Sequence, residues 1–349
     1  MKAAVYYGKG DVRVEEVEEP EPRHGEVKVR IAYNGLCGTD VHEVFDGPRA
    51  IPLQPHPLTG AVVPLILGHE AAGVVVGVGN GVDGVEEGDL VAIEPIVRCG
   101  TCTWCRAGDY NMCERHAFHG ISTGGGGLAE HTTVPATMIH RLPPSVDPRH
   151  AALVEPLAVA HHAVARAGVH RGQLAAIHGA GPIGIGVLLS LRASGVECVV
   201  LEPSAERRAV AEALGATTVD PSREGFDAVA ALGEVTGGRR ADVSFDTAGG
   251  STTFRSAVAT TRSHGTVALV ASPRAPMASP VLTELLSREI DVRASYAYCG
   301  DFPSVIEQVV AGAYPLDGWV STMPLTDVVR ALELLRAGQL IKVLIDPTA

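Results

Sequence analysis

The stretch Ile177-His178-Gly179-Ala180-Gly181-Pro182-Ile183-Gly184 decides the fold of the second half of the chain. It follows an apolar run from Leu174 that is typical of a buried strand, and it opens a segment, Ile183 to Ser194, that is typical of a helix. Its three glycines fit G-x-G-x-x-G. The first permits a tight turn, the second lets backbone approach a pyrophosphate, and the third lets the helix pack closely on the strand. Because a helix N-terminus attracts phosphate, the segment predicts a dinucleotide-binding site.

Glu202 lies at the end of the next predicted strand, eighteen residues beyond Gly184. A carboxylate there can accept hydrogen bonds from both hydroxyls of an adenine ribose and would repel a 2′-phosphate, which favours NAD over NADP. Arg207 and Arg208 leave the other preference open, because they could meet a phosphate if Glu202 points away. The simpler alternative is that the glycines only make a turn and Glu202 is a solvated loop charge.

The pattern of apolar runs along the sequence predicts an α/β fold in two parts. After Pro143 and Pro144, compact apolar runs alternate with helical segments, the βαβ rhythm of a parallel sheet. Before them, short strands are broken by Gly and Pro. We expect strands at 27–32, 71–78, 90–94, 174–178, 198–201, 243–246 and 267–270, and helices at 183–194, 205–214, 226–235, 252–260, 302–310 and 328–336.

Four of the seven cysteines, Cys99, Cys102, Cys105 and Cys113, have the spacing C-x2-C-x2-C-x7-C. Such spacing lets four thiolates converge on one tetrahedral ion, as in a structural zinc site with no place left for water. The alternative is two disulfides in a secreted, loop-rich domain. The sequence shows no N-terminal basic and apolar signal segment, and 349 residues can bury a large core without disulfide bonds. We therefore expect zinc, and a reducing cytoplasm as the location.

A second metal site is indicated by Cys37, by His69 and Glu70 in Gly68-His69-Glu70, and by Glu155. Each residue alone is more often a core or surface residue. Together they offer a mixed shell of thiolate, imidazole and carboxylate, which leaves room for water or substrate. A zinc ion there would be a Lewis acid that lowers the pKa of an alcohol oxygen.

The composition excludes some partners. A net charge of −12, with no block of Lys or Arg, disfavours nucleic acid, whose phosphates need a basic face. No window approaches the roughly 18 uninterrupted apolar residues of a membrane span.

These motifs, taken together, make the chain resemble the zinc-containing medium-chain dehydrogenase/reductase family, which includes alcohol and sorbitol dehydrogenases. The resemblance covers nearly the whole length and looks most like the (R,R)-2,3-butanediol dehydrogenase branch, which has an insertion between the first zinc ligand and Gly-His-Glu. Here thirty-two positions separate Cys37 from His69. The motifs that carry it, in family order, are Cys37-Gly38-Thr39-Asp40, Gly68-His69-Glu70, Gly88-Asp89-Leu90-Val91, the four-cysteine run, Glu155-Pro156-Leu157 and the glycine motif.

The resemblance implies a discontinuous arrangement of domains. A GroES-like, mostly β catalytic domain would span 1–151, with a structural zinc lobe at 95–115, and residues 297–349 would return to it. A doubly wound parallel Rossmann domain that binds NAD would span 152–296. The family also implies a homodimer or homotetramer.

The resemblance also implies roles at the reactive site. Cys37, His69 and Glu155 would hold the catalytic zinc, with Glu70 entering or leaving the shell as water and substrate exchange. The hydroxyl of Thr39 would take the substrate proton, and His42 would pass it through the cofactor ribose to solvent.

The function that these expectations support is zinc- and NAD-dependent oxidation of a vicinal diol or secondary alcohol. The substrate we expect is (R,R)-2,3-butanediol, oxidised to acetoin, with acetoin or diacetyl reduced in the reverse direction. The insertion around residues 46–60 favours this small diol. Sorbitol or another polyol and L-threonine are the alternative substrates, and a non-catalytic zinc and nucleotide sensor is the alternative from another class.

Overall fold

The computed structural model describes residues 1–271 and 281–349, which divide into two compact units. The first unit joins Met1–Glu155 to Phe302–Ala349, and the second is Pro156–Asp301. The divisions fall four and five residues beyond the boundaries expected from the sequence, at 151 and 296.

The second unit is built on a six-stranded sheet in which every strand pair is parallel. The strand order is β13-β12-β11-β14-β15-β16, so its direction reverses between β11 and β14. Ligands of such sheets bind beyond the carboxyl ends of the strands at this reversal. The strands are β11 (Leu174–His178), β12 (Glu197–Leu201), β13 (Thr217–Val219), β14 (Ala241–Asp246), β15 (Thr261–Leu269) and β16 (Asp291–Ala294).

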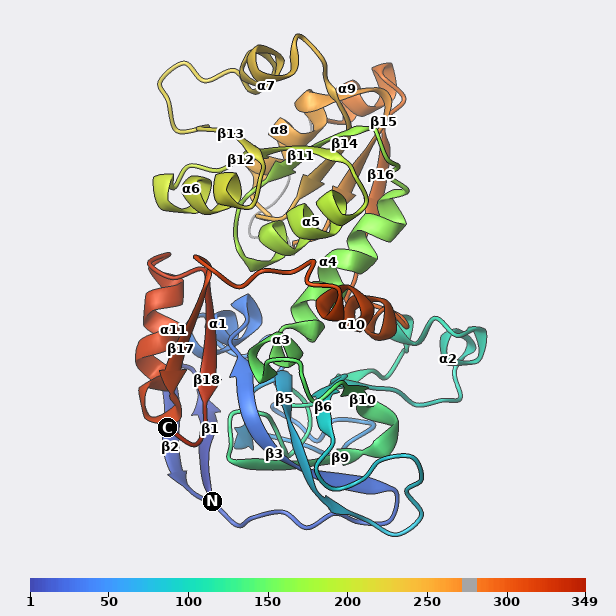
Figure 1. Cartoon of the computed structure of the whole chain (residues 1–349), viewed down its shortest axis with the longest axis vertical. Coiled ribbons are helices and arrows are strands. Elements are labelled where there is room, and N and C mark those ends of the chain that lie inside the picture. Colours follow the sequence, from blue (N-terminus) through green and yellow to red (C-terminus); the bar gives the residue numbers. More distant parts are fainter. Residues whose placement is uncertain (272–280) are drawn as a thin grey trace. The chain divides into compact units, whose positions relative to one another are not determined.

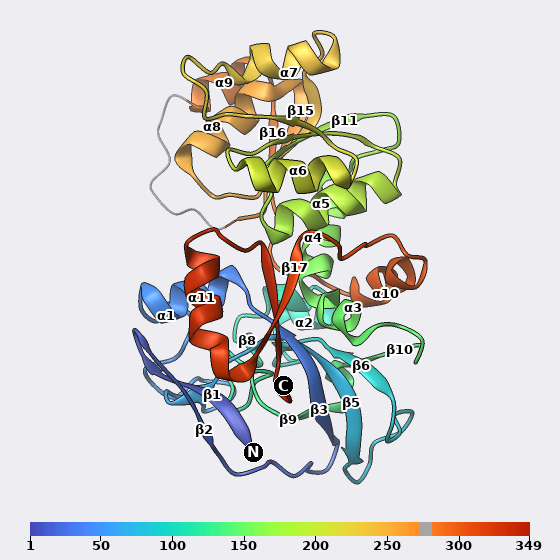
Figure 2. The ribbon, with the colours of Figure 1, turned by 60° about the vertical axis from the view of Figure 1, so that its left-hand side comes forward.

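Helices cover both faces of this sheet (Figures 1 and 2). One face carries α5 (Pro182–Ala193) and α6 (Ala205–Ala213), and the other carries α8 (Ser251–Thr260). Both α7 (Ala228–Thr236) and α9 (Val281–Ser287) pack against α8. The four strands and four helices expected in this unit are confirmed, although β15 begins six residues before its expected start at 267. The edge strands β13 and β16 went unpredicted, because β13 has only three residues and β16 is exposed along its length.

The first unit is organised around β3 (Glu26–Gly35), which pairs with β5, β9 and β18. Its main sheet runs β10-β6-β5-β3-β18-β17. The strands of the C-terminal return therefore lie in the same sheet as the N-terminal ones. These strands are β5 (Glu70–Val78), β6 (Leu90–Ile93), β9 (His131–Pro135), β10 (Ile139–Leu142), β17 (Val320–Pro324) and β18 (Lys342–Asp346).

The helices of the return segment, α10 (Phe302–Val310) and α11 (Val328–Arg336), have the bounds expected from their amphipathic pattern. Val328 and Leu332 of α11 are fully buried in a core that includes Tyr6 and Leu36. The unit also contains β1 (Lys2–Gly8), β2 (Asp11–Glu16), β4 (Leu65–Ile66), β7 (Ile96–Val97), β8 (Ala117–Phe118), α1 (Gly38–Phe45), α2 (Thr103–Ala107), α3 (Pro148–Ala152), η1 (Tyr110–Met112), η2 (Ala136–Met138) and η3 (Leu325–Asp327). Helix α4 (Val154–Ala167) begins in this unit and continues into the second.

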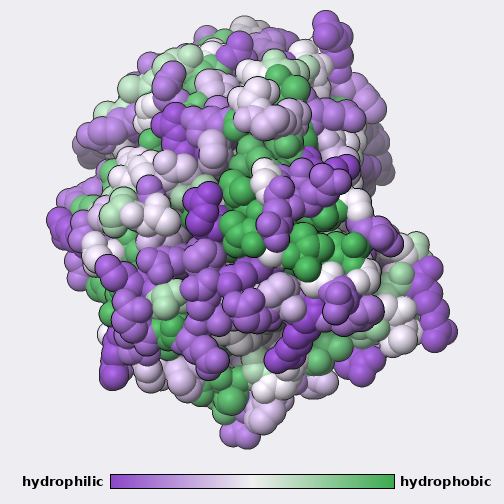
Figure 3. All heavy atoms as spheres, turned by 60° about the horizontal axis from the view of Figure 1, so that its bottom comes forward, coloured by the Kyte–Doolittle hydropathy of each residue, from purple (hydrophilic) through white to green (hydrophobic). Residues whose placement is uncertain are grey.

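The surface shown in Figure 3 is mainly hydrophilic, with apolar side chains in limited areas. Among the helices of the described residues, none has the length and apolar character needed to cross a membrane.

Candidate active site

Cys37, His69 and Glu70 converge because of the register between β3 and β5. Gly35, near the end of β3, is the pairing partner of Glu70 at the start of β5. Cys37 lies two residues beyond Gly35 and caps the N-terminus of α1, while His69 directly precedes β5. One ligand atom from each of Cys37, His69 and Glu70 lies within 4.8 Å of the others. A side chain at position 35 would collide with the Glu70 carboxylate and displace it from its present position.

Asp40 supports two members of this group. Its carboxylate is fully buried and accepts a hydrogen bond from the Cys37 backbone N–H at 2.9 Å. Its other oxygen lies 3.5 Å from His69 Nδ1, and the described residues offer neither atom a hydrogen bond of good geometry. Burial alone would lower the pKa of His69, but Asp40 and Cys37 outweigh it and raise that pKa well above its ordinary value. A carboxylate beside a histidine is the usual support of a metal-binding imidazole.

The donors of this group are a thiol sulfur, an imidazole nitrogen and a carboxylate oxygen. These are the atoms that zinc accepts in open, reactive sites. The excess of negative charge around His69 means that a cation is electrostatically favoured there, whether a proton or a metal ion. The residues present therefore fit zinc.

Glu70 forms a buried ion pair with Lys342 of β18, and both side chains are 1 % exposed. Lys342 Nζ also donates to the Leu36 carbonyl at 3.0 Å. A buried charge is tolerated when it is paired and hydrogen-bonded, so each of the two depends on the other. Sequence reasoning missed this lysine and Asp40. The sequence does contain a signal for this lysine, because Lys342 is the one charged residue in the otherwise apolar run 341–345.

Thr39 and His42 lie on α1, in the same helix that Cys37 caps. Their spacing of three places them on one side of the helix. The Thr39 hydroxyl is 3.6 Å from the Cys37 sulfur, and His42 Nδ1 is 2.7 Å from an oxygen of Asp46.

Glu155 is buried at the start of α4, but it lies outside the group whose ligand atoms are within 4.8 Å of one another. The geometry thus includes Glu70 in that group and leaves Glu155 out.

The four cysteines of the predicted lobe also converge. Their sulfurs lie within 4.8 Å of one another, and all seven cysteines of the chain are free thiols. Backbone N–H groups of Thr101 and Cys102 point at Cys99 Sγ, at 3.4 and 3.3 Å. Together with the Thr101 hydroxyl, the largest cause, they lower the pKa of Cys99 to about 5. Converging thiols with N–H groups aimed at sulfur fit a closed tetrathiolate site.

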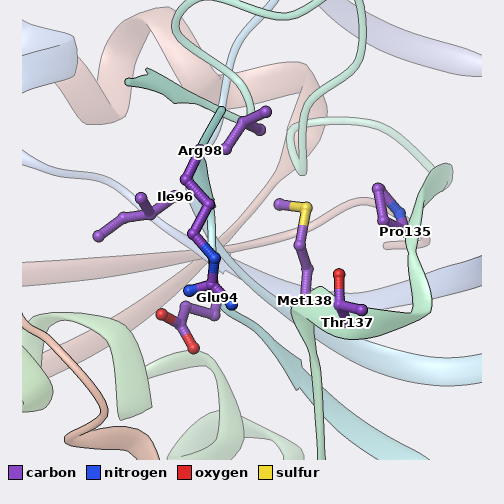
Figure 4. A pocket seen from close by; sticks show the side chains of 7 residues that line it. Glu94, Ile96, Arg98, Pro135, Thr137 and Met138 are labelled. Atoms are coloured by element: carbon purple, nitrogen blue, oxygen red, sulfur yellow. The ribbon is translucent and has the colours of Figure 1, made fainter. Parts of the chain in front are cut away.

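The lobe is fastened to the sheet through Glu94, which follows β6. Its carboxylate accepts a hydrogen bond from the Tyr110 hydroxyl at 2.6 Å and lies 2.6 Å from His140 Nε2 of β10. Figure 4 shows Glu94, Arg98 and Met138 around a cavity of about 110 Å³ at this junction. The Glu94 carboxylate is engaged by both of these partners, which join the lobe to the sheet.

The glycine turn of the second unit has the geometry that its sequence predicts. Gly179 has φ of +107°, a conformation that favours glycine. A side chain at Gly184 would collide with the Gly179 carbonyl, whereas one at Gly181 would meet nothing within 4 Å. Gly184 therefore serves packing, and Gly181 leaves an open cradle in front of the N-terminus of α5. Pro182 and Ile183 are the first two residues of that helix.

Glu202 points toward the glycine turn. One of its oxygens accepts the Ala180 backbone N–H at 2.7 Å and the other accepts that of Ser204 at 2.9 Å. Arg208 is occupied elsewhere, since it bonds the Glu202 carbonyl and pairs with Asp220 at 3.1 Å. Arg207 is half-buried on α6.

Comparison with known proteins agrees with this geometry. Residues 23–144 match the alcohol dehydrogenase GroES-like domain, and residues 182–311 match the zinc-binding dehydrogenase model. The (R,R)-butanediol dehydrogenase of Bacillus subtilis is 37 % identical, over 92 % of this chain and 91 % of its own. The chain belongs to the zinc-binding alcohol dehydrogenase family. It is an α/β oxidoreductase, with a GroES-like domain as its first unit and a Rossmann domain as its second.

Other members of the dehydrogenase family are similar along the full length. A sorbitol dehydrogenase of Bombyx mori is 34 % identical and covers 98 % of this chain and 97 % of its own. The crystal structure of 2R,3R-butanediol dehydrogenase from Bacillus subtilis superposes with a TM-score of 0.93, at 35 % identity, covering 99 % of each chain. Among structural relatives of this dehydrogenase, one from Escherichia coli is complexed with NADH and one from Sinorhizobium meliloti is bound to NADP.

Substitution of Gly184 and of Gly181 by alanine should have different effects. Gly184→Ala should lower the free energy of unfolding by about 1–3 kcal/mol, because the added methyl collides with the Gly179 carbonyl. Gly181→Ala should leave unfolding nearly unchanged but weaken NADH binding by at least about tenfold, because the methyl fills the cradle. Denaturant unfolding and NADH fluorescence titration measure the two effects. Equal stability loss in both variants would contradict this assignment.

The cysteine lobe predicts a loss of stability before a loss of chemistry. Cys105→Ser should remove about one zinc equivalent per chain and lower the thermal midpoint, because a structural metal contributes its binding energy to folding. Cys198→Ala, at a buried cysteine of β12 away from the lobe, is the matched control and should retain all zinc. Zinc analysis and thermal unfolding give the readout. Unchanged zinc content in Cys105→Ser would refute a metal site in the lobe.

Proposed function

We propose that the protein catalyses zinc- and NAD-dependent oxidation of a vicinal diol or secondary alcohol. The substrate proposed is (R,R)-2,3-butanediol, oxidised to acetoin, with reduction of acetoin or diacetyl in reverse. The observation that carries the proposal is the convergence of Cys37, His69 and Glu70 in a chain that also has the glycine turn of a dinucleotide site. The similarity to (R,R)-butanediol dehydrogenase supports the choice of substrate.

When bound, zinc would lower the pKa of the substrate hydroxyl, and NAD would accept the hydride from the carbinol carbon. Cys37 and His69 would hold the metal, with Glu70 or Glu155 as the carboxylate partner. Asp40 would keep the His69 ring in its liganding orientation. Lys342 would hold Glu70 in place through their ion pair.

The proton of the substrate hydroxyl must leave as the hydride departs. We assign its acceptance to the Thr39 hydroxyl, which lies beside the Cys37 sulfur. His42, one turn further along α1, would carry the proton toward solvent. As it accepts the substrate proton, Thr39 would release its own hydroxyl proton, so that one net proton passes along the relay to solvent.

NAD is the proposed cofactor rather than NADP. The carboxylate of Glu202 faces the glycine turn, where it would meet the adenine ribose and repel a 2′-phosphate. Arg208 is committed to Asp220 and to two backbone carbonyls, so it offers little to such a phosphate.

Two further features complete the proposal. The four cysteines would hold a second, structural zinc.

The edge strand β16 is exposed along its length, and Leu286 of the preceding helix is 80 % exposed. Within residues 1–271 and 281–349, no strand pairs with the outer edge of β16, and this edge supports assembly into a homodimer or homotetramer in which the edge strands pair. The cytoplasm is the proposed location.

A sorbitol or other polyol dehydrogenase is the second candidate, because a sorbitol dehydrogenase is similar along the whole chain. The loop that follows α1 favours the smaller diol. The Glu43 carboxylate accepts backbone N–H groups of Arg49, Ala50 and Ile51, at 2.9, 2.8 and 3.2 Å, and so holds this loop close to the helix that carries Thr39.

A substrate panel separates these candidates. We expect kcat/KM for (R,R)-2,3-butanediol to exceed the values for sorbitol and L-threonine by at least about tenfold, because a closed pocket discriminates against extra groups. Initial rates with the (R,R), (S,S) and meso diols, sorbitol and L-threonine provide the measurement. A preference for sorbitol would reject the diol, and no turnover of any alcohol in zinc-loaded protein would favour the sensor alternative.

The cofactor assignment predicts the effect of removing one charge. Glu202→Gln should reduce the ratio of kcat/KM with NAD to that with NADP by about tenfold or more, because repulsion of the 2′-phosphate is lost. Glu206→Gln, at a neighbouring exposed carboxylate that accepts a hydrogen bond from the Ser204 hydroxyl, is the control and should leave this ratio unchanged. A wild-type enzyme that turns over faster with NADP would refute the role of Glu202.

A further inference from the structure

We propose that Asp46 is a positioning residue for proton release, and that it acts by fixing the orientation and tautomer of His42. The inference rests on the proposed function, in which His42 carries the proton toward solvent. Asp46 is the C-terminal capping residue of α1, four positions after His42.

The geometry between the two side chains is direct. An oxygen of Asp46 lies 2.7 Å from His42 Nδ1, and the Asp46 backbone N–H donates to the His42 carbonyl at 2.9 Å. Asp46 is therefore bound to the same helical turn through both backbone and side chain. A short contact with a carboxylate favours the tautomer in which Nδ1 carries the hydrogen. Nε2 is then left as the unprotonated atom that can receive a proton.

Three titratable or charged groups face Asp46, from three parts of the first unit. They are His42 of α1, Arg49 of the following loop at 3.5 Å, and Arg336 of α11. The hydrogen bond with His42 is the largest cause that lowers the pKa of Asp46, and the two arginines lower it further. The carboxylate is thus ionised at neutral pH and acts only as an acceptor toward His42.

The surroundings hold this arrangement in place. The Arg49 backbone is fixed by the buried Glu43 carboxylate, and the Arg336 guanidinium stacks on the Phe45 ring at 4.6 Å. Both arginines are therefore anchored next to Asp46 independently of it. This is the arrangement by which a carboxylate orients a histidine that transfers protons in other enzymes.

A double-mutant cycle tests the proposal, with kcat for oxidation of the best secondary alcohol by NAD as the readout. Asp46→Asn should lower kcat about tenfold in the wild-type background, because the histidine loses its fixed tautomer. In a His42→Ala background the same substitution should change kcat less than twofold, since there is no ring left to orient. Glu289→Gln, which removes the carboxylate of the exposed His264–Glu289 pair in the second unit, should change neither.

A second measurement reads the tautomer without catalysis. A long-range ¹H–¹⁵N spectrum of protein with ¹⁵N-labelled histidine should show His42 with its hydrogen on Nδ1, and Asp46→Asn should shift it toward the other form. If Asp46→Asn lowers kcat equally in both backgrounds, or if the His42 tautomer does not change, the proposal is overturned while the relay stands. If His42→Ala itself leaves kcat unchanged, the relay of the proposed function fails instead.

Discussion

The pairing of Gly35 with Glu70 is the constraint on which the reactive site depends. It aligns the end of β3 with the start of β5, so that Cys37 and His69, each next to its strand, approach the same point. A slip of one residue would turn every side chain of one strand to the opposite face. Glycine at position 35 secures the register locally, because any side chain there would collide with Glu70.

The same point joins the two separate segments of the first unit. Lys342, brought by β18 from the C-terminal return, reaches Glu70 and the Leu36 carbonyl. Buried charges are costly unless each is paired, so the return strand and the metal-site strand stabilise each other. The buried carboxylates of Asp40 and Glu43 lie close by. One oxygen of Asp40 accepts the Cys37 backbone N–H, and Glu43 holds the loop after α1. The buried charges Asp40 and Glu43 thus lie on the same helix, α1, as the proposed relay residues Thr39 and His42.

The sequence predicted local features well and long-range partners poorly. The glycine motif specified its turn, since Gly179 has positive φ and Gly184 packs against the Gly179 carbonyl. The amphipathic helices α10 and α11 were predicted to the residue. Edge strands β13 and β16 lacked the buried, apolar pattern on which strand prediction rests. The partners Asp40, Asp46 and Lys342 were not assigned, because their roles depend on contacts that form only in the folded chain.

The carboxylate of the metal site illustrates the same limit. Family resemblance predicted Glu155 as a ligand and Glu70 as one that enters or leaves, whereas of these two carboxylates the group within 4.8 Å of Cys37 and His69 contains Glu70. A diffraction experiment at the zinc absorption edge tests the central claim most directly. Two anomalous peaks per chain are expected, one among the four lobe cysteines and one about 2.3 Å from Cys37 Sγ and about 2.0–2.1 Å from a ring nitrogen of His69. A fully zinc-loaded crystal with no peak between Cys37 and His69 would contradict it.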